Sequence, residues 1–304
     1  MYSKPSYSPI VTLPHRHIVT SDRLTSDIRL LTSGKRIDLT TTKKIYFASD
    51  FHLGIDARVT SAERERQIVR WLDAIAADAA EIYLVGDVFD FWFEYHTVVP
   101  KGYVRLFGKL AELRDAGLPI YFFTGNHDMW MFRYFEEEFG IPIYRKPIVR
   151  EFNGKTFCIG HGDGLGPGDY GYKFIKRVFA NKLCQWAFER IHPNFGIWLA
   201  QFWSGRSRAA NPSEMQFLGP EGEWLIAYCN RKLDTQYADY FIFGHRHLPI
   251  DYTLKNERSR YINLGEWLYH NSYAVFDGER LELRFFENDH GHVFGLPPAV
   301  VSSV

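Results

Sequence analysis

Five short apolar runs along the chain each end abruptly in polar residues. The stretches that contain them are KKIYFASDFHLG (43–54), EIYLVGDVFD (81–90), LPIYFFTGNHD (118–128), KTFCIGHGDG (155–164) and DYFIFGHRHLP (239–249). Continuously apolar runs of this length, rich in aromatic and β-branched residues, are typical of strands buried on both faces of a sheet. The chain is therefore predicted to contain five internal strands, each ending in Gly, Asp, Asn or His.

Helical patterns separate the first three of these runs. Residues 61–80 place Ile68, Leu72 and Ile75 at helical spacing, and residues 104–117 end in a glycine suited to a helix C-cap. Strands that alternate with helices predict an α/β layered fold. In such folds the functional side chains lie at the carboxyl ends of the strands.

The two ends of the chain have different patterns. The C-terminal third contains YINLGEW (261–267), SYAVFD (272–277) and LELRFF (281–286), which are predicted to be consecutive strands that close a second sheet. Residues 1–42 are polar, rich in Ser and Thr, and weakly patterned. We interpret them as a peripheral N-terminal arm, followed by one main domain over residues 43–304.

One basic and aromatic segment interrupts the alternation of strands and helices. Residues 173–203 hold eight Phe or Trp residues, and residues 173–208 carry seven Lys or Arg against one acid, Glu189. Apolar positions recur at helical spacing at Ile175, Val178, Phe179, Leu183, Trp186, Ala187 and Ile191. Pro193 then separates a second, short apolar helix. We predict a helical insertion at about residues 170–212.

The composition limits the class of protein. With 304 residues, of which 46% are hydrophobic, the chain can bury a core in one large domain. Its 36 basic and 36 acidic residues balance, so a polyanion-binding surface for nucleic acid is not indicated. Cys158, Cys184 and Cys229 are widely spaced, which argues against a disulfide framework. Since neither a secretory signal nor a membrane span is recognisable, we expect a soluble cytoplasmic protein.

Side chains that favour divalent metals follow all five predicted strands. They are Asp50, His52, Asp87, Asp90, Asn126, His127, Asp128, His161, His245 and His247. Carboxylates, neutral imidazoles and an amide oxygen suit Mn, Fe, Zn and related ions, and a shared aspartate can hold two cations about 3.5–4 Å apart. Each motif alone is typical of a turn or a helix cap. The five together predict a metal centre, and the absence of cysteine from the set argues against structural zinc.

The order of these motifs resembles the calcineurin-like metallophosphoesterase family over about residues 44–290. The matching motifs are D-x-H (Asp50, His52), GDxxD (Asp87, Asp90), GNHD (Asn126, His127), a later strand-end His (His161) and GHxH (His245, His247). The resemblance implies a two-sheet α/β sandwich flanked by helices, with a dinuclear metal centre in its loops. It also implies metal-dependent hydrolysis of phosphoric ester or diphosphate bonds.

The same resemblance assigns roles to individual side chains. One metal takes Asp50, His52, Asp87 and His247. The other takes Asp87, Asn126, His161 and His245, with Asp87 bridging and a hydroxide between the metals as the nucleophile. His127 is expected to contact the phosphate and protonate the leaving oxygen, and the Asp90 carboxylate to fix the tautomer of His127. Manganese is the expected ion, and the ligands also accept Fe, Zn or Co.

The helical insertion resembles the lid of the UDP-2,3-diacylglucosamine pyrophosphohydrolase family of lipid A synthesis. The shared motifs are DxHLG at 50–54, GDxF with a following tryptophan (Asp87, Phe89, Trp92), HGDxL at 161–165, the spacing of Asp169, Gly171 and Tyr172, and SRAAN at 207–211. That family cleaves UDP-2,3-diacylglucosamine to UMP and 2,3-diacylglucosamine 1-phosphate. The resemblance implies substrate contacts from Asn126, Asp169, Tyr172, Ser207, Arg208 and Asn211. It also implies a slot for acyl chains and a peripheral contact with the cytoplasmic face of the inner membrane.

Alternatives stay open at this point. The best-known members of that family have GNRD where this chain has GNHD, so the substrate could be another nucleotide diphosphate, a phosphodiester or a phosphomonoester. Residues 173–203 could also be a packed hairpin or a dimer interface. A non-catalytic scaffold would be expected to have lost ligands, and none of the seven is missing. Arg246, between the last two histidines, has no role that the sequence predicts.

Overall fold

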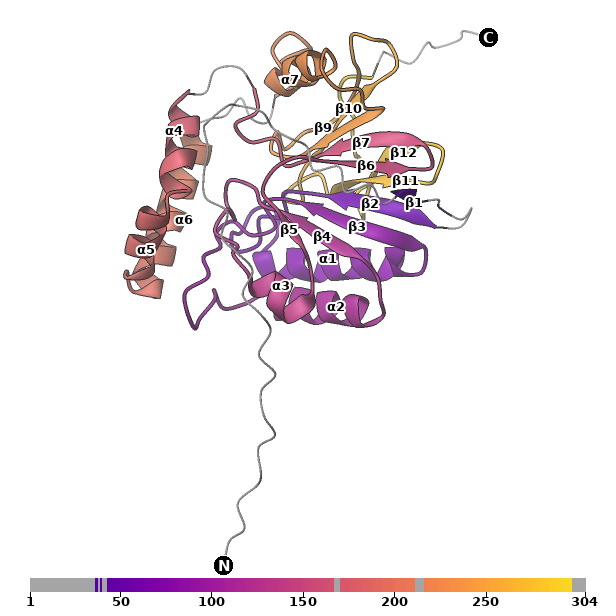
Figure 1. Cartoon of the computed structure of the whole chain (residues 1–304). Helices are drawn as coiled ribbons and strands as arrows, with labels where there is room; N and C mark the ends of the chain where they lie inside the picture. The colour runs from indigo at the N-terminus through magenta and orange to yellow at the C-terminus, as the bar shows by residue number, and fades with distance from the viewer. Residues whose placement is uncertain (1–35, 38, 40–42, 167–169, 211–215, 297–304) are drawn as a thin grey trace, which may run out of the picture.

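Two six-stranded sheets form the centre of the protein (Figure 1), in a computed structural model that describes residues 36–37, 39, 43–166, 170–210 and 216–296. The first sheet has the order β12 (Leu281–Phe285), β11 (Ser272–Phe276), β2 (Lys44–Ala48), β3 (Ala79–Val85), β4 (Ile120–Phe123) and β5 (Ile143–Tyr144). The second has the order β1 (Arg36–Ile37), β6 (Ile148–Phe152), β7 (Lys155–Ile159), β8 (Tyr240–Phe243), β10 (Arg260–Leu264) and β9 (Pro249–Thr253). Strands β2 to β4 run parallel to one another, and so do β7 and β8.

Helices cover the outer faces of both sheets (Figure 1). The first sheet carries α1 (Ser61–Ala76), α2 (Val104–Asp115) and α3 (Tyr134–Phe139), and the second carries α7 (Trp224–Lys232). One hydrophobic core lies between the two sheets, and a further core lies under each helical layer. The predicted two-sheet α/β sandwich flanked by helices is therefore confirmed.

Alternation along the strands explains why their sequences are apolar throughout. In β2, Ile45 and Phe47 belong to the core between the sheets, while Tyr46 and Ala48 belong to the core under the helices. Strand β3 alternates in the same way. Because both faces of each strand are buried, polar residues can appear only where the strand ends. This transition puts the candidate ligands at the carboxyl ends of the strands.

The helices α1 and α2 form where the helical patterns predicted them. Thr60 caps α1 in a capping box with Glu63, and Ile68 and Leu72 on the inner face are fully buried. Helix α2 ends just before Gly117, which has a φ of +86° that residues with a side chain rarely adopt. Both helices pack on the first sheet and close the core beneath it.

The C-terminal third differs from its prediction. YINL forms part of β10 in the second sheet, whereas SYAVF and LELRF form β11 and β12, which extend the first sheet beside β2. The prediction that all three strands close one second sheet is therefore wrong, because the chain crosses between the sheets after β10. In the arm, residues 36–37 form the edge strand β1 along β6, and the boundary at residue 42 stays a prediction.

The insertion contains three helices, α4 (Tyr170–Phe179), α5 (Lys182–Glu189) and α6 (Pro193–Ala210). The sequence predicted one helix through Ile191, but the chain breaks before α5, where Asn181 accepts hydrogen bonds from the amides of Leu183 and Cys184. Pro193 begins α6, as prolines often do at a first helical position. Helix α6 has 18 residues and is not the short helix that was predicted.

This helical insertion (α4–α6) packs on the rest of the protein through aromatic side chains. Phe91, Phe93 and Trp130 form a cluster with Phe179 and Phe188 of the insertion. The Trp130 indole also donates a hydrogen bond of 2.8 Å to the carbonyl of Phe179. The three helices stand to one side of both sheets (Figure 1). Among the helices that the structure describes, none has the length and apolar character to cross a bilayer.

Candidate metal centre

The two sheets bring five strand ends to one edge of the sandwich. Just past β2, β3, β4, β7 and β8 lie Asp50, Asp87, Asn126, His161 and His245. Backbone hydrogen bonds connect the loops: the Asp50 amide donates to the Gly86 carbonyl at 3.0 Å, and the Gly244 amide to the His161 carbonyl at 2.9 Å. The backbone hydrogen bonds between neighbouring strands thus continue past the strand ends and hold the loops of each sheet together.

Donor atoms converge in two groups at this edge. Ligand atoms within 4.8 Å of one another come from Asp50, His52, Asp87 and His247. A second such group comes from Asp87, His161 and His245. Asn126 joins the second group, because its Oδ1 lies 2.8 Å from His245 Nδ1 and 3.2 Å from His161 Nε2. The structure therefore brings all seven predicted ligands together, with Asp87 in both groups.

Backbone strain concentrates at these residues. Positive φ occurs at Asp50 (56°), His52 (45°), Asp87 (52°), His245 (69°) and His247 (54°). A non-glycine residue in this left-handed region costs on the order of 1 kcal/mol or more and persists only where its surroundings hold it. Five of the ten described non-glycine residues with positive φ belong to the predicted ligand set. Backbone strain is therefore concentrated at the residues whose side chains converge as predicted metal ligands.

Two glycines allow the loops to approach this closely. A Cβ atom on Gly125 would collide with the Asp87 carboxylate, and one on Gly244 would collide with the Ser49 hydroxyl and the Asp50 carboxylate. Any side chain at either position would push a ligand away from the group. The glycines that begin the GNH and GHxH motifs are therefore part of the site's construction.

Hydrogen bonds orient the imidazole rings. His161 Nδ1 donates to the Val85 carbonyl at 2.8 Å, a bond that joins a loop of the second sheet to β3 of the first. This bond keeps the proton on Nδ1 and turns the Nε2 lone pair toward Asp87 Oδ2, 3.3 Å away. His52 is oriented by charge instead, since its Nδ1 faces the Asp90 carboxylate at 3.3 Å and its Nε2 faces the ligand group.

The donor atoms suit divalent cations. Asp50 Oδ1 and Asp87 Oδ2 are buried and have no hydrogen-bond partner among the described residues. A buried carboxylate oxygen without a donor is costly unless a cation neutralises it. The Nε2 atoms of His52 and His247 lie 3.1 Å apart, a distance at which two lone pairs repel unless a proton or a cation lies between them. Both observations fit a metal centre.

The electrostatics of the site agree with this fit. Burial would raise the pKa of Asp50, but the His247 and His52 imidazoles that face its carboxylate outweigh this effect and hold the pKa well below its usual range. Burial would lower the pKa of His52 and His161, but the neighbouring aspartates raise both to about 10. Protons and metal ions compete for the same imidazole lone pairs. The aspartate charge that stabilises a proton on these rings would therefore also stabilise a metal cation at the same place.

His127 lies beside the ligand groups. Its ring centre is 4.8 Å from that of His52, and its amide donates to Asp87 Oδ1 at 2.8 Å. Its Nδ1 lies 3.0 Å from the Asp90 carbonyl and 3.6 Å from the Asp90 carboxylate. The sequence assigned the orienting role to that carboxylate, whereas in the structure the shorter contact is with the carbonyl. The carboxylate itself lies nearer to His52.

The geometry can now be compared with known proteins. The profile of the calcineurin-like phosphoesterases matches residues 43–249. This chain belongs to the calcineurin-like phosphoesterase family. A UDP-2,3-diacylglucosamine hydrolase from Porphyromonas gingivalis is 38% identical, over 81% of this chain and 98% of its own length. One from Aeromonas salmonicida is 31% identical, over 78% of this chain and 92% of its own. A phosphoesterase of solved structure from E. coli overlaps 80% of this chain and 93% of its own, with a TM-score of 0.42 and 15% identity.

One residue of this phosphoesterase that sequence reasoning left unexplained is Arg246. Its guanidinium turns away from the two flanking histidines and donates to both carboxylate oxygens of Glu223, at 2.8 and 2.9 Å, and to the Gln216 carbonyl at 3.0 Å. Glu223 is fully buried at the start of α7. The bidentate pair therefore fixes the GHRH loop to the helix that covers the second sheet. Its partner is 23 positions away, so no local pattern could have indicated it.

Two further residues that fix the loops of the phosphoesterase centre were also missed. The guanidinium of Arg64 on α1 is fully buried and donates to the carbonyls of Phe51 and His52 at 2.8 and 2.7 Å. Asp128 accepts from the Gly125 amide at 2.7 Å and from the Val88 amide at 2.8 Å, which joins the GNHD loop to the GDVFD loop. The sequence analysis named Asp128 among the strand-end residues but gave it no role. In the sequence, Arg64 is one of several charged residues in a helical pattern, so nothing marked it as buried.

The predicted substrate contacts are only partly covered by the structure. Asn126 lies in the second ligand group. Tyr172 is on α4, and Ser207 and Arg208 are on α6, but the described part of the chain does not include their side chains. Asp169 and Asn211 lie outside the described residues. Their contacts with substrate stay predictions.

Proposed function

We propose that this protein is a metal-dependent phosphohydrolase that cleaves the diphosphate of UDP-2,3-diacylglucosamine, giving UMP and 2,3-diacylglucosamine 1-phosphate. The observation that carries the proposal is the convergence of seven ligand side chains beside His127, in a chain with an exposed aromatic insertion. The two relatives described above, both named as UDP-2,3-diacylglucosamine hydrolases, support this substrate.

The ligand groups would hold two divalent cations, for which we propose manganese. The first would lie among Asp50, His52, Asp87 and His247, and the second among Asp87, Asn126, His161 and His245. When bound, such ions supply Lewis-acid charge to phosphoryl oxygens and activate water as a nucleophile. The chain's part is to keep the donors in place, and the His127 amide does this for Asp87.

His127 is the candidate for binding the phosphoryl group and returning a proton. Since its Nδ1 is engaged with the Asp90 carbonyl, Nε2 is the ring atom that can meet a phosphoryl oxygen. Burial lowers the pKa of His127, so Nε2 would carry a proton for the leaving oxygen only when the anionic phosphoryl group stabilises the protonated ring. The ring is the most accessible imidazole beside the first ligand group, with 16% of its side chain exposed against 14% for His247 and none for His52.

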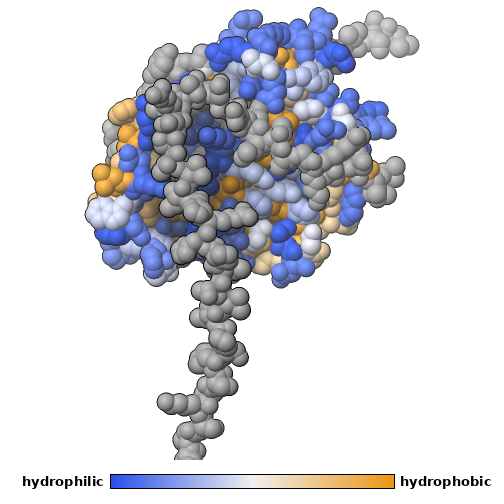
Figure 2. Space-filling view, in the orientation of Figure 1, coloured by the Kyte–Doolittle hydropathy of each residue, from blue (hydrophilic) through white to orange (hydrophobic). Residues whose placement is uncertain are grey.

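The helical insertion suits a substrate with two acyl chains. Its exposed large apolar side chains are Phe174, Ile175, Leu183, Trp186, Phe195, Trp198 and Phe202. They make up seven of the thirteen large hydrophobic side chains exposed among the described residues. Figure 2 shows apolar residues along the left edge of the molecule, where the insertion stands in Figure 1. A patch of this kind marks a surface for lipid or protein.

The insertion is joined directly to the loops of the centre. Lys176 of α4 pairs with the carboxylate of Asp163, which follows the candidate ligand His161 by two residues. Lys173 of the same helix donates to the Gly166 carbonyl at 2.6 Å. These contacts join the insertion to the loops of the centre, where the proposed slot for acyl chains would open.

We also propose that the insertion contacts the cytoplasmic face of the inner membrane, where a diacylated nucleotide sugar would be taken up. Basic residues are interleaved with its aromatics, and the Arg190 guanidinium lies 5.0 Å from the centre of the Trp186 ring. Aromatic and basic side chains together favour the headgroup region of an anionic bilayer. Flotation with vesicles that contain phosphatidylglycerol tests this contact, and no flotation would reject it.

Product analysis tests the proposed function. The purified protein is incubated with UDP-2,3-diacylglucosamine and manganese, and the products are separated and weighed by mass spectrometry. We expect equal amounts of UMP and lipid 1-phosphate, and neither product in the presence of a chelator. If bis(p-nitrophenyl) phosphate is hydrolysed rapidly while UDP-2,3-diacylglucosamine is not hydrolysed, the phosphohydrolase activity stands and the lipid substrate is rejected.

A further inference from the structure

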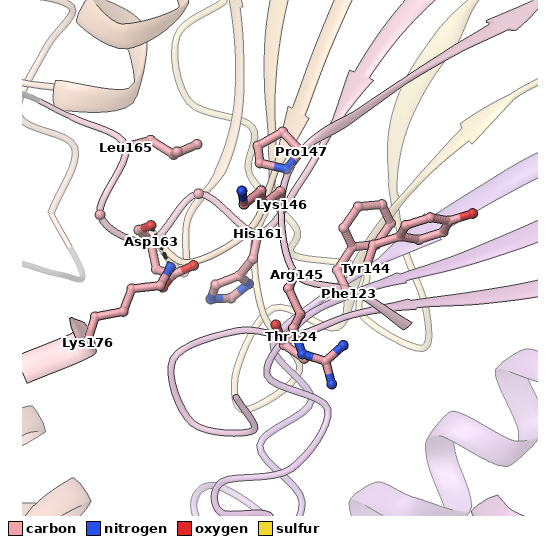
Figure 3. A pocket seen from close by; sticks show the side chains of 12 residues that line it. Phe123, Thr124, Tyr144, Arg145, Lys146, Pro147, His161, Asp163, Leu165 and Lys176 are labelled. Atoms are coloured by element: carbon pink, nitrogen blue, oxygen red, sulfur yellow. Dashed lines mark hydrogen bonds and ion pairs between the residues drawn. The ribbon is translucent and has the colours of Figure 1, made fainter. Parts of the chain in front are cut away.

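We propose that the cavity between the β5–β6 loop, the loop after β7 and helix α4 binds the nucleotide half of the substrate, a pyrimidine nucleoside monophosphate. This inference rests on the proposed function, since it divides one substrate between two surfaces. The cavity has a volume of about 280 Å³. The residues that matter for the argument are Thr124, Lys146, Pro147, His161, Leu165 and Lys176, which all line it (Figure 3).

The cavity borders the metal centre at His161. His161 lines its wall, and the Nε2 atom of the same ring lies 3.3 Å from Asp87 Oδ2 and 3.2 Å from Asn126 Oδ1. A group bound here is therefore next to the phosphorus that the centre attacks. The cavity must accordingly receive one of the two groups that flank the diphosphate.

One cation of the cavity is available to a ligand. Lys176 is paired with Asp163, and Arg145 donates to the carbonyls of Met131 and Phe132, so these charges have partners in the protein. Lys146 is exposed and makes no hydrogen bond or ion pair within the part of the chain that the structure describes. A lysine of this kind at the mouth of a cavity favours a phosphate-bearing ligand.

The remaining walls suit a small heterocycle with hydroxyl groups. Phe123, Tyr144, Pro147 and Leu165 offer apolar surface, and the Thr124 side chain adds a hydroxyl group to the wall. A volume near 280 Å³ lies just below the usual range of ligand sites, about 300–1,000 Å³, and matches one nucleotide half better than a lipid with two acyl chains.

The lipid half has a different surface available. Large exposed aromatic side chains such as Trp186, Trp198 and Phe202 belong to the helical insertion. The cavity, by contrast, combines Lys146 and Thr124 with the apolar surface of Phe123, Tyr144, Pro147 and Leu165 in a small volume. An amphiphilic substrate would therefore place its acyl chains on α4–α6 and its nucleotide in the cavity, with the diphosphate across the metals.

Calorimetry on the manganese-loaded protein tests the subsite with two probes, UMP and glucosamine 1-phosphate. Lys146→Ala should weaken UMP binding about tenfold, the usual size of one lost charge-assisted contact, and leave the sugar phosphate unchanged. Thr124→Val should weaken UMP binding by a smaller factor. Lys155→Ala is the matched control, because Lys155 is an exposed lysine at the opposite end of β7, and both ligands should bind it as they bind the unaltered protein.

Three results would overturn the assignment. They are unchanged UMP binding in Lys146→Ala, a loss confined to glucosamine 1-phosphate, and an equal loss for both probes, which would mean that Lys146 acts on the metal centre. Failure of the proposed function looks different. An inert UDP-lipid in the product assay, together with a selective loss of UMP binding in Lys146→Ala, would reject the lipid substrate and keep the nucleotide subsite.

Discussion

The metal centre and the helical insertion hold their functional side chains in opposite ways. In the centre, Asp50, His52 and Asp87 are fully buried, adopt strained φ angles, and are fixed by hydrogen bonds from neighbouring loops. In the insertion, Trp186 and Trp198 expose 54% and 57% of their surface. Ions require donors at set distances, whereas acyl chains require apolar area without a fixed geometry. Under the proposed function, the centre would determine the reaction and the insertion would determine the substrate.

The largest expected effect comes from breaking the centre at the shared carboxylate. Asp87→Asn removes the charge that faces both ligand groups, so hydrolysis of any phosphoester should fall by at least ~10²–10³-fold, the usual loss when one group that stabilises transition-state charge is removed. Steady-state rates with UDP-lipid and with a chromogenic diester measure this, and circular dichroism checks the fold. Asp115→Asn, at an exposed aspartate at the end of α2, is the control and should be fully active. Comparable activity in Asp87→Asn would mean that the bridging residue is misassigned.

The second effect breaks the support of the centre while leaving the ligands in place. Arg246→Met leaves Glu223 buried without its partner, which should lower the free energy of unfolding by about 3–5 kcal/mol. Urea unfolding measures the change. The double variant Arg246→Met/Glu223→Leu should recover much of the loss, since no unpaired charge is left. A double variant as unstable as the single one would show that the ion pair is not the reason.

The third effect concerns the insertion alone. Trp198→Ser removes an exposed aromatic side chain that packs against Phe195 and Phe202, with ring centres 5.6 and 5.9 Å away. Loss of one large apolar contact should raise KM for UDP-lipid by roughly tenfold and leave hydrolysis of the small diester unchanged. Val104→Ser, which alters an exposed apolar residue on α2, should change neither. Equal losses on both substrates in Trp198→Ser would contradict the separation of roles.

The sequence predicted the centre better than the insertion, for a physical reason. Ligands such as Asp87 and His161 follow strands that are apolar on both faces, so the change to polar residues marks each strand end in the sequence itself. Parallel pairing then brings these ends together without further information. The insertion has no such constraint. Its apolar positions keep helical spacing across Asn181, and only the structure shows that α4 ends at Phe179 and that Asn181 caps the start of α5.

What the sequence did not predict are contacts between distant positions. The pair of Arg246 and Glu223, and the bonds from Arg64 to the loop after β2, depend on how α7 and α1 dock on their sheets. The division of β10 and β11 between the two sheets is of the same kind, since strand patterns do not state which strands pair. Local signals therefore predicted the elements and the ligands, and tertiary packing determined what holds them.

The central claim, a dinuclear centre that cleaves the UDP-lipid, is tested most directly by a metal titration. Chelator-treated protein receives manganese in steps while bound metal and UMP release are measured in the same samples. Both ligand groups share Asp87, so we predict no turnover without metal and full turnover when two ions are bound per chain. Turnover that persists in chelator, or that is complete with a single bound ion, would contradict the account.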